Sequence, residues 1–371
     1  MNLSYWEIKT WLTDIDFTII GSGIVGLNTA LELRNNYPKA KILILEKGML
    51  PQGASTKNAG FACFGSLSEI IDDLEQHTPA QVLSLVERRI RGLALLREIV
   101  GDVNLDFKNY GGYELFLKEN DALYQKCLES KDRINKLLKP LFGEDVFSFK
   151  DNSFGFSHVT NKLGFNQYEG QIDTGKMMLS LLKKTLDADI RILNNFKVEH
   201  IEEESDSATI VSKHYQFKSS KVFIATNGFA AQLLHEDVKP ARAQVLITKP
   251  IQNLKIKGSF HLDRGYYYFR NIDNRVLFGG GRNLDFKGEE TTEFGETKLI
   301  QDKLEELLKT TIIPDQKFEV DYTWSGIMGV GNQKESIVKP LSKNVFCGVR
   351  LGGMGVAIGS IVGKDLANLI E

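Results

Sequence analysis

The segment from residue 17 to residue 46 constrains the fold of this chain most. Residues 17–20 are apolar and read as a buried strand, and the run Gly21-Ser22-Gly23-Ile24-Val25-Gly26 follows at once. A helical pattern continues to residue 33, and a second apolar strand at residues 41–45 ends on Glu46. Strand, glycine turn, helix and strand in this order predict a βαβ unit of a parallel sheet.

The glycine spacing of this unit indicates a nucleotide site. In a G-x-G-x-x-G turn, Gly21 permits the tight bend, Gly23 lets a pyrophosphate approach the backbone, and Gly26 allows close helix–strand packing. The helix N-terminus offers free N–H groups and a positive dipole end to phosphates. Glu46, 20 residues after the last glycine (46 minus 26), can accept hydrogen bonds from ribose hydroxyls. We therefore predict a dinucleotide site; the alternative is a tight turn that binds nothing.

Composition excludes several classes of protein. The 371 residues are 42% hydrophobic and carry a formal net charge of -2, which gives no reason to expect a nucleic acid or an anionic membrane as partner. The first 16 residues lack a signal pattern, and no run approaches the roughly 20 apolar residues of a membrane helix. Cys63, Cys127 and Cys347 are too scattered for a disulfide framework or a zinc site. We expect a cytoplasmic, metal-free protein, with its oligomeric state left open.

The α/β pattern recurs in separate stretches of the chain. Residues 17–67, 155–235 and 320–371 are predicted to form one discontinuous domain that binds the nucleotide. Residues 68–154 and 236–319, rich in strands and helices, are predicted to form a second domain that covers it, and residues 1–16 an N-terminal arm. The expected fold class is α/β with two interleaved domains.

Two later strands also end in turns of small residues. A strand at residues 221–225 leads into Ala225-Thr226-Asn227-Gly228, and a strand at residues 344–349 leads into Gly352-Gly353-Met354-Gly355. A final helix is expected from residue 356 to residue 370, so its N-terminus is a second anion-favouring end. Further helices are expected at residues 68–100, 119–139, 174–187 and 291–309.

Five segments in order resemble the FAD-dependent D-amino-acid oxidase superfamily, which includes glycine oxidase, sarcosine oxidase and gamma-glutamylputrescine oxidase. They are the first glycine turn with Glu46, residues 53–60 (GASTKNAG), residues 225–228, residues 324–326 (WSG) and residues 352–357 (GGMGVA). The second is the most specific, because the family typically has G-A-S-x-x-N-x-G just after the acidic residue. The resemblance covers nearly the whole chain and implies a Rossmann-like FAD-binding domain interleaved with a substrate domain on a mixed or antiparallel sheet.

The resemblance implies FAD in an extended, non-covalent pose. The ADP half would lie on the first glycine turn, with Val198 facing the adenine, and residues 53–60 would line the passage to the flavin ring. The turn from Gly353 to Val356 would sit under the pyrimidine edge, where a helix N-terminus stabilises the negative charge of reduced flavin. The residues implied to bind the cofactor are Gly21, Ser22, Gly23, Ile24, Val25, Gly26, Glu46, Lys47, Ser55, Thr56, Asn58, Ala59, Gly60, Val198, Ala225, Thr226, Gly228, Gly352, Gly353, Met354, Gly355 and Val356.

The implied reaction is oxidation of a C–N bond in a small amine or amino acid. A neutral amine loses a hydride from its α-carbon to flavin N5, and the imine then hydrolyses. Tyr268 matches the tyrosine that relatives place over the flavin, and strand alternation puts Tyr266 on the same face. Cys63, just past the passage motif, is a further candidate for contact with the ring.

The substrate side departs from the family at one position. Relatives that oxidise amino acids often have W-x-G-x-R, whose arginine holds the substrate carboxylate, whereas this chain has Met328 there. Either the substrate lacks an α-carboxylate or another cation substitutes. Arg350 is the first candidate for that cation, and the others are Lys57, Arg270 and Arg282.

The electron acceptor and two other functions stay open. The lysine that sarcosine oxidases place near flavin N5 is matched by Leu277, so the acceptor is either oxygen or another oxidant. The alternative function is a flavin-dependent tRNA-modification enzyme that oxidises an aminomethyl side chain, which the near-neutral charge disfavours. A non-catalytic flavoprotein is a third possibility. A second G-x-G-x-x-G for a nicotinamide cofactor is absent.

Overall fold

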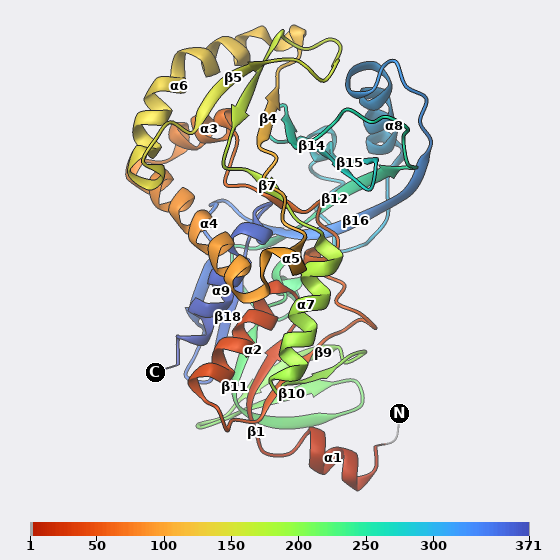
Figure 1. The fold of residues 1–371 in the computed structure, drawn as a ribbon. Coiled ribbons are helices and arrows are strands. Elements are labelled where there is room, and N and C mark those ends of the chain that lie inside the picture. The colour runs from red at the N-terminus through yellow and green to blue at the C-terminus, as the bar shows by residue number, and fades with distance from the viewer. Residues whose placement is uncertain (1–2, 371) are drawn as a thin grey trace.

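Two large sheets organise the chain. The computed structural model describes residues 3–370. Figure 1 shows one sheet with α2 (Ile24–Asn36) and α7 (Thr174–Asp187) in the lower half of the view, and the other sheet with α6 (Asp121–Phe142) and α8 (Lys298–Leu307) in the upper half. The observed fold is the expected α/β arrangement of two interleaved parts.

The first sheet has eight strands and is largely parallel. Its main path runs β17-β18-β11-β1-β2-β8, and the β9–β10 hairpin continues from β11. Ile20 pairs in parallel register with Leu45 on one side and with Ile224 on the other, and Ile224 pairs with Cys347. The carboxyl ends of these strands therefore meet at one edge of the sheet. The strands are β1 (Ile15–Ile20), β2 (Ile42–Leu45), β8 (Arg191–Leu193), β9 (Val198–Glu203), β10 (Ala208–Ser212), β11 (Gln216–Ile224), β17 (Ile337–Pro340) and β18 (Val345–Val349).

Helix α2 and the last helix, α9 (Gly355–Ala367), pack closely on this sheet. A Cβ atom at Gly359 would lie 2.4 Å from Ile24, and one at Gly363 would lie 2.7 Å from the Val25 carbonyl oxygen. The Thr29 hydroxyl donates to the Gly363 carbonyl at 3.1 Å. Glycines in α9 thus let the first and last helices touch, although 334 residues separate the bonded pair.

The second sheet also has eight strands, in the order β16-β12-β15-β14-β13-β4-β6-β5. Phenylalanines fill its core, where the rings of Phe260 and Phe269 stack at 4.6 Å and Phe156 meets both rings edge-on. Its strands are β4 (Gly112–Leu115), β5 (Phe147–Asp151), β6 (Lys162–Asn166), β12 (Lys239–Thr248), β13 (Ser259–Leu262), β14 (Tyr267–Ile272), β15 (Arg275–Gly280) and β16 (Val320–Val330). A short ribbon of β3 (Phe61–Ala62) and β7 (Gly170–Gln171) lies apart from both sheets.

The predicted boundaries differ from the observed sheets at two strands. Both β6 and β16 belong to the second sheet, although residues 155–235 and 320–371 were assigned to the nucleotide-binding domain. Strand β16 pairs with β12 along nearly its whole length, and its Met328 lies against Gly228 in the turn after β11. This strand therefore joins the two parts.

Two of the predicted helices have different bounds in the structure. The helix expected at residues 68–100 is divided by Pro79 into α3 (Leu67–Gln76) and α4 (Pro79–Val100), because Thr78 caps a new helix there. The helix expected from residue 291 begins only at Lys298 as α8, and a π-helical turn at Leu308–Ile312 ends it. A four-residue helix, α5 (Asp102–Leu105), follows α4.

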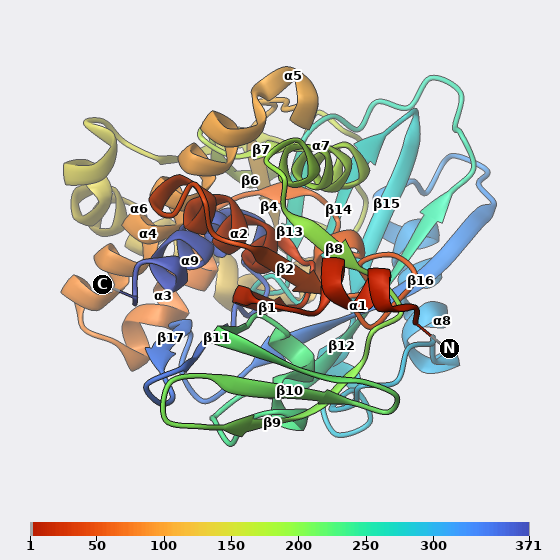
Figure 2. The ribbon, with the colours of Figure 1, turned by 90° about the horizontal axis from the view of Figure 1, so that it is seen from below.

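The N-terminal arm contains α1 (Tyr5–Trp11), which buries none of its residues. It lies beside β8 at the margin of the first sheet, where Arg191 donates to the Thr10 carbonyl (Figure 2). Among residues 3–370, no helix combines the length and the apolar character needed to cross a bilayer.

We expect Gly26→Ala to disrupt the contact between α2 and β1. A Cβ atom at residue 26 would lie 1.9 Å from the Gly21 carbonyl oxygen, and backbone on both sides cannot move aside. The free energy of unfolding should fall by about 3 kcal/mol, at the upper end of overpacking costs. Chemical denaturation measures the loss. Gly53→Ala is the control, because a methyl group there meets no atom within 4 Å. Equal stability of the two variants would contradict the packing role of Gly26.

Candidate active site

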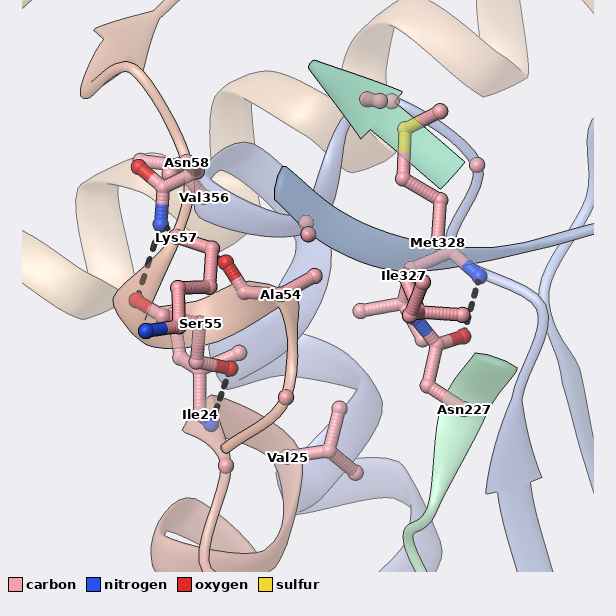
Figure 3. Close-up of a pocket in the computed structure, with 18 of the residues that line it drawn as sticks. Ile24, Val25, Ala54, Ser55, Lys57, Asn58, Asn227, Ile327, Met328 and Val356 are labelled. Atoms are coloured by element: carbon pink, nitrogen blue, oxygen red, sulfur yellow. Dashed lines mark hydrogen bonds between the residues drawn. The ribbon is translucent and has the colours of Figure 1, made fainter. Parts of the chain in front are cut away.

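A cavity of about 400 Å³ lies where the carboxyl edge of the first sheet faces the second sheet. Its wall brings together the turns after β1, β11 and β18, the loop at residues 53–60, and residues of β12, β14 and β16. Figure 3 shows how Ile24, Ser55, Asn227, Met328 and Val356 approach it from these separate elements. One space therefore collects most of the motifs predicted from the sequence.

The first glycine turn has the geometry of a phosphate cradle. Gly21 has φ +105°, and a Cβ atom on it would lie 2.9 Å from the Ala225 carbonyl oxygen. A Cβ atom on Gly23 would lie 2.9 Å from the Ser55 hydroxyl, which accepts from the Ile24 backbone N–H at 2.9 Å (Figure 3). The N-terminus of α2 therefore opens onto the cavity, with the Ser55 hydroxyl hydrogen-bonded to its first N–H.

Glu46 is buried at the end of β2 and lines the cavity. Its carboxylate accepts from the Ser22 N–H at 3.1 Å, the Ser22 hydroxyl at 2.6 Å and the Gly48 N–H at 3.0 Å. Ser22 thus orients the acid rather than facing the cavity itself. A fixed carboxylate beside the first glycine turn suits two ribose hydroxyls.

The loop at residues 53–60 is held by its own asparagine. The Asn58 amide donates to the Ser55 carbonyl at 2.9 Å and accepts from the Gly60 N–H at 2.9 Å and from the Thr174 hydroxyl at 2.8 Å. Residues 54–56 form a short 3₁₀ turn as a result. This explains why the motif requires an asparagine four residues after Ala54.

The C-terminal glycine turn, residues 352–355, lines the same cavity as the first glycine turn. Cβ atoms on Gly352 and Gly353 would meet nothing within 4 Å, so this turn faces open space at the N-terminus of α9. Thr226 also lines the cavity, and its hydroxyl is buried without a hydrogen-bond partner. Two helix N-termini, an orphaned hydroxyl and a fixed carboxylate fit an extended dinucleotide with a pyrophosphate.

Four of the residues predicted to bind the cofactor lie behind the cavity wall. Ser22 binds Glu46, and Gly26 packs against Gly21. The Thr56 hydroxyl donates to the Pro51 carbonyl at 2.8 Å. A Cβ atom on Gly228 would lie 2.6 Å from the Met328 carbonyl oxygen. These residues shape the wall, and the other predicted cofactor residues line it.

Of the residues predicted to contact the substrate, some line the cavity and others do not. Tyr268 and Met328 both line the cavity. Arg350 lies outside the lining, because its guanidinium donates to the Asp237 carboxylate at 2.8 Å and to the Glu335 carbonyl at 2.9 Å. The structure therefore does not support Arg350 as a substrate contact. Arg270 is buried behind Gly60, also outside the lining.

Burial raises the pKa values of two side chains in the cavity wall, Tyr268 and Cys63. Burial raises the pKa of Tyr268 to about 12, so its phenol stays neutral and can donate a hydrogen bond. Cys63 lines the cavity, and burial raises the pKa of its thiol well above the ordinary value, which keeps it a poor nucleophile. Cys127 and Cys347 are buried away from the cavity.

Phe61, Glu69 and His261 are among the wall residues that sequence reasoning missed. His261 is buried on β13, its ring meets Phe61 edge-on at 5.4 Å, and its Nε2 lies 2.9 Å from the Glu169 carboxylate. None of the three belongs to a glycine or aromatic motif. Because His261 and Glu169 are 92 residues apart, no local signal in the sequence could pair them.

The His261–Glu169 pair fixes a positive charge beside the cavity. Burial opposes that charge, but the carboxylate of Glu169, with those of Glu69 and Glu114 nearby, outweighs burial and raises the pKa of His261 to about 9. Glu114 is buried as well, and burial raises its pKa to about 7 despite hydrogen bonds from Ser68.

We expect Glu169→Gln to destabilise the protein in a pH-dependent way. The folded pKa of His261, about 9, lies above its ordinary 6.5, so the pair's contribution is full below pH 6.5 and is lost as the pH rises through 9. The difference in free energy of unfolding between the variant and the original protein should therefore shrink across this window. Denaturant titrations at several pH values measure it. Glu202→Gln removes the partner of the exposed His200 and is the control. A difference that is constant with pH would contradict the assignment.

Comparison with other proteins by sequence gives several relatives, among them the following two. The chain is 20% identical over 381 residues to a protein named probable oxidoreductase OrdL from Haemophilus influenzae, covering 97% of this chain and 84% of that one. It is 23% identical to the mitochondrial L-2-hydroxyglutarate dehydrogenase of Bos taurus, covering 75% of this chain and 63% of the relative.

Solved structures and a family model agree with the fold. The crystal structure of glycine oxidase from Bacillus cereus superposes with a TM-score of 0.75 at 19% identity, over 96% of this chain and 94% of that one. The model of the DAO family, FAD dependent oxidoreductases, matches residues 16–369. The chain has the glycine turns and the acidic residue that a dinucleotide needs, and the family model covers nearly its whole length. It therefore belongs to the DAO family of FAD dependent oxidoreductases and uses FAD as its cofactor.

Proposed function

We propose that this oxidoreductase oxidises a C–N bond of a small amine or amino acid. The observation that carries the proposal is the set of residues that line the cavity. The same cavity that the two glycine turns line continues to a substrate end with Tyr268, Met328 and an apolar cluster. Glycine oxidase shares this fold, and its name describes the oxidation of an amino acid.

The chain's own residues would hold FAD along this wall. The N-terminus of α2 and the Ser55 region would bind the pyrophosphate, and Glu46 the adenosine ribose. The N-terminus of α9, at Gly355 and Val356, would stabilise negative charge on the ring. When bound, FAD supplies the acceptor for a hydride.

The substrate end favours the neutral form of an amine. Buried Ala59, Val245 and Leu277 form an apolar cluster there, with Tyr268 packed against it. Low polarity raises the energy of an ammonium ion, so a bound amine loses its proton more easily than in water. The neutral Tyr268 phenol can then orient the amine by a hydrogen bond.

The reaction balances without a dedicated base. The substrate carbon would lose a hydride, and the nitrogen lone pair would form the C=N bond of an imine in its protonated, iminium form. Water then adds to the imine and releases a carbonyl compound and an amine or ammonia. Oxygen or another acceptor would take up the two electrons removed from the substrate.

We expect the purified protein to be yellow and its flavin absorption to bleach anaerobically on addition of a substrate amine or amino acid. A panel of primary amines, secondary amines and amino acids tests this, with 2-hydroxy acids in parallel because one relative is named for such a substrate. Admitting air and then an artificial oxidant identifies the electron acceptor. Bleaching by 2-hydroxy acids alone, or by no member of the panel, would refute C–N oxidation.

We expect Tyr268→Phe to lower kcat/KM about five- to tenfold, the value of one hydrogen bond. The Tyr268 hydroxyl has no hydrogen-bond partner within residues 3–370, while its ring packs on Phe61 at 5.6 Å, so the variant loses only the donor. Stability should not change. Tyr113→Phe is the matched control, because that ring stacks on Phe260 outside this cavity. Full activity of the Tyr268 variant would exclude the phenol from substrate binding.

A further inference from the structure

Arg282 is a cation on the substrate end of the cavity wall. It opens the short turn η4 (Arg282–Leu284) directly after β15. Gly280 has φ +128° and Gly281 has φ +79°, conformations that reverse the chain at this point. A Cβ atom on Gly280 would lie 2.1 Å from the Tyr266 carbonyl oxygen. The glycines thus bring Arg282 next to the start of β14, where its side chain lines the cavity together with Tyr266.

The protein supplies no anion to this arginine. Within residues 3–370, the Arg282 guanidinium makes no hydrogen bond and no ion pair. The two carboxylates whose charges act on it, Glu289 and Glu290, are paired with other side chains. Glu289 binds Arg242 through two bonds of 2.8 Å, and Glu290 pairs with Lys239 at 3.4 Å. Arg282 is nevertheless half-buried, and burial lowers its pKa. A partly buried charge without a partner is costly unless a ligand of opposite charge completes it.

Aromatic rings fix the orientation of the guanidinium. It lies 4.8 Å from the centroid of the Phe286 ring, and that ring meets Tyr266 edge-on at 5.9 Å. Stacking on one face leaves the N–H groups at the edge of the guanidinium free. A planar fork of donors matches the two oxygens of a carboxylate.

The register of the second sheet places Arg282 at the same end of that sheet as Met328. Gln244 of β12 pairs with Gly280 of β15, and Ala241 of β12 pairs with Met328 of β16. Two residues beyond Gly280, Arg282 is therefore at the same end of the sheet as Met328, with β12 between them. Both side chains line the cavity.

Other cations of the wall have different surroundings. Lys47 lies 3.1 Å above the Phe229 ring and follows Glu46 directly, and Lys197 precedes Val198, so both belong to the adenosine side. Lys57 is in the loop at residues 53–60, and its Cβ packs on Gly326. The charge of His261 is already paired with Glu169, so Lys57 is the competing candidate on the substrate side.

We propose that Arg282 binds a carboxylate of the substrate, so that the substrate is an amine that also carries a carboxylate, as in an amino acid. This rests on the proposed C–N oxidation, but its test does not. The probes are anthranilate and aniline, which share a ring and an amino group and differ only in the carboxylate. Each is titrated into the FAD-loaded protein, and the perturbation of the flavin absorption gives its Kd.

In the original protein, anthranilate should bind more tightly than aniline. Arg282→Met should weaken anthranilate about tenfold to a hundredfold, the effect of losing a charge-assisted pair, and should leave aniline unchanged. Arg282→Lys should fall between, because it keeps the charge and loses the fork. Lys57→Met, which removes the competing cation, should leave both affinities unchanged, and retention of FAD by every variant shows that the fold is intact.

Two results would overturn the proposal. One is equal binding of anthranilate and aniline to the original protein, and the other is loss of anthranilate binding in the Lys57 variant but not in the Arg282 variant. Either could occur while amines still bleach the flavin, which would leave the proposed function standing. Failure of all amines and amino acids to bleach the flavin, with anthranilate binding intact, would refute C–N oxidation alone.

Discussion

The parallel register of β1, β2, β11 and β18 is the constraint on which the rest of the structure depends. Because Ile20 lies level with Leu45 and Ile224, each of these strands ends at the same edge of the sheet. The segments that follow them come from parts of the chain more than 300 residues apart, yet they face one space. A shift of one residue would move every side chain to the opposite face of the sheet, where the neighbours packed on that face would no longer match it, so packing on both faces fixes this register.

The shared edge also brings two helix N-termini to one cavity. Helices α2 and α9 begin there at Ile24 and Gly355, and both are held by glycine contacts too close for any side chain. Each end presents unpaired N–H groups and a positive dipole end. One suits a pyrophosphate and the other a ring that becomes negative on reduction. A single extended cofactor can therefore use both ends, which explains why glycine motifs at opposite ends of the sequence belong to one site.

Local patterns in the sequence predicted the cofactor half of the site, because each residue there is required by the turn in which it lies. Gly21, Glu46 and Asn58 act through their own turns, and a turn fixes both residue type and spacing. The helix at residues 174–187 was predicted to the residue for the same reason, since Asp173 caps it. The break at Pro79 and the assignment of β16 to the second sheet were missed. Strand pairing depends on partners far along the chain, which periodicity cannot identify.

The substrate half was less accessible to sequence reasoning, because its chemistry is assembled across strands. The sequence offered several candidate cations, of which Arg350, just before a glycine turn, ranked first. The structure shows that Asp237 already neutralises Arg350, whereas the carboxylates near Arg282 are bound by Arg242 and Lys239. A cation is therefore free to bind a ligand when the carboxylates near it are paired with other cations, and it is structural when one of them pairs with it. A sequence motif specifies one position on one strand, whereas a substrate carboxylate can be bound by a cation from any strand that reaches the cavity. A neighbouring strand of the same sheet can supply that charge when its end turns inward, as β15 does at Gly280 and Gly281.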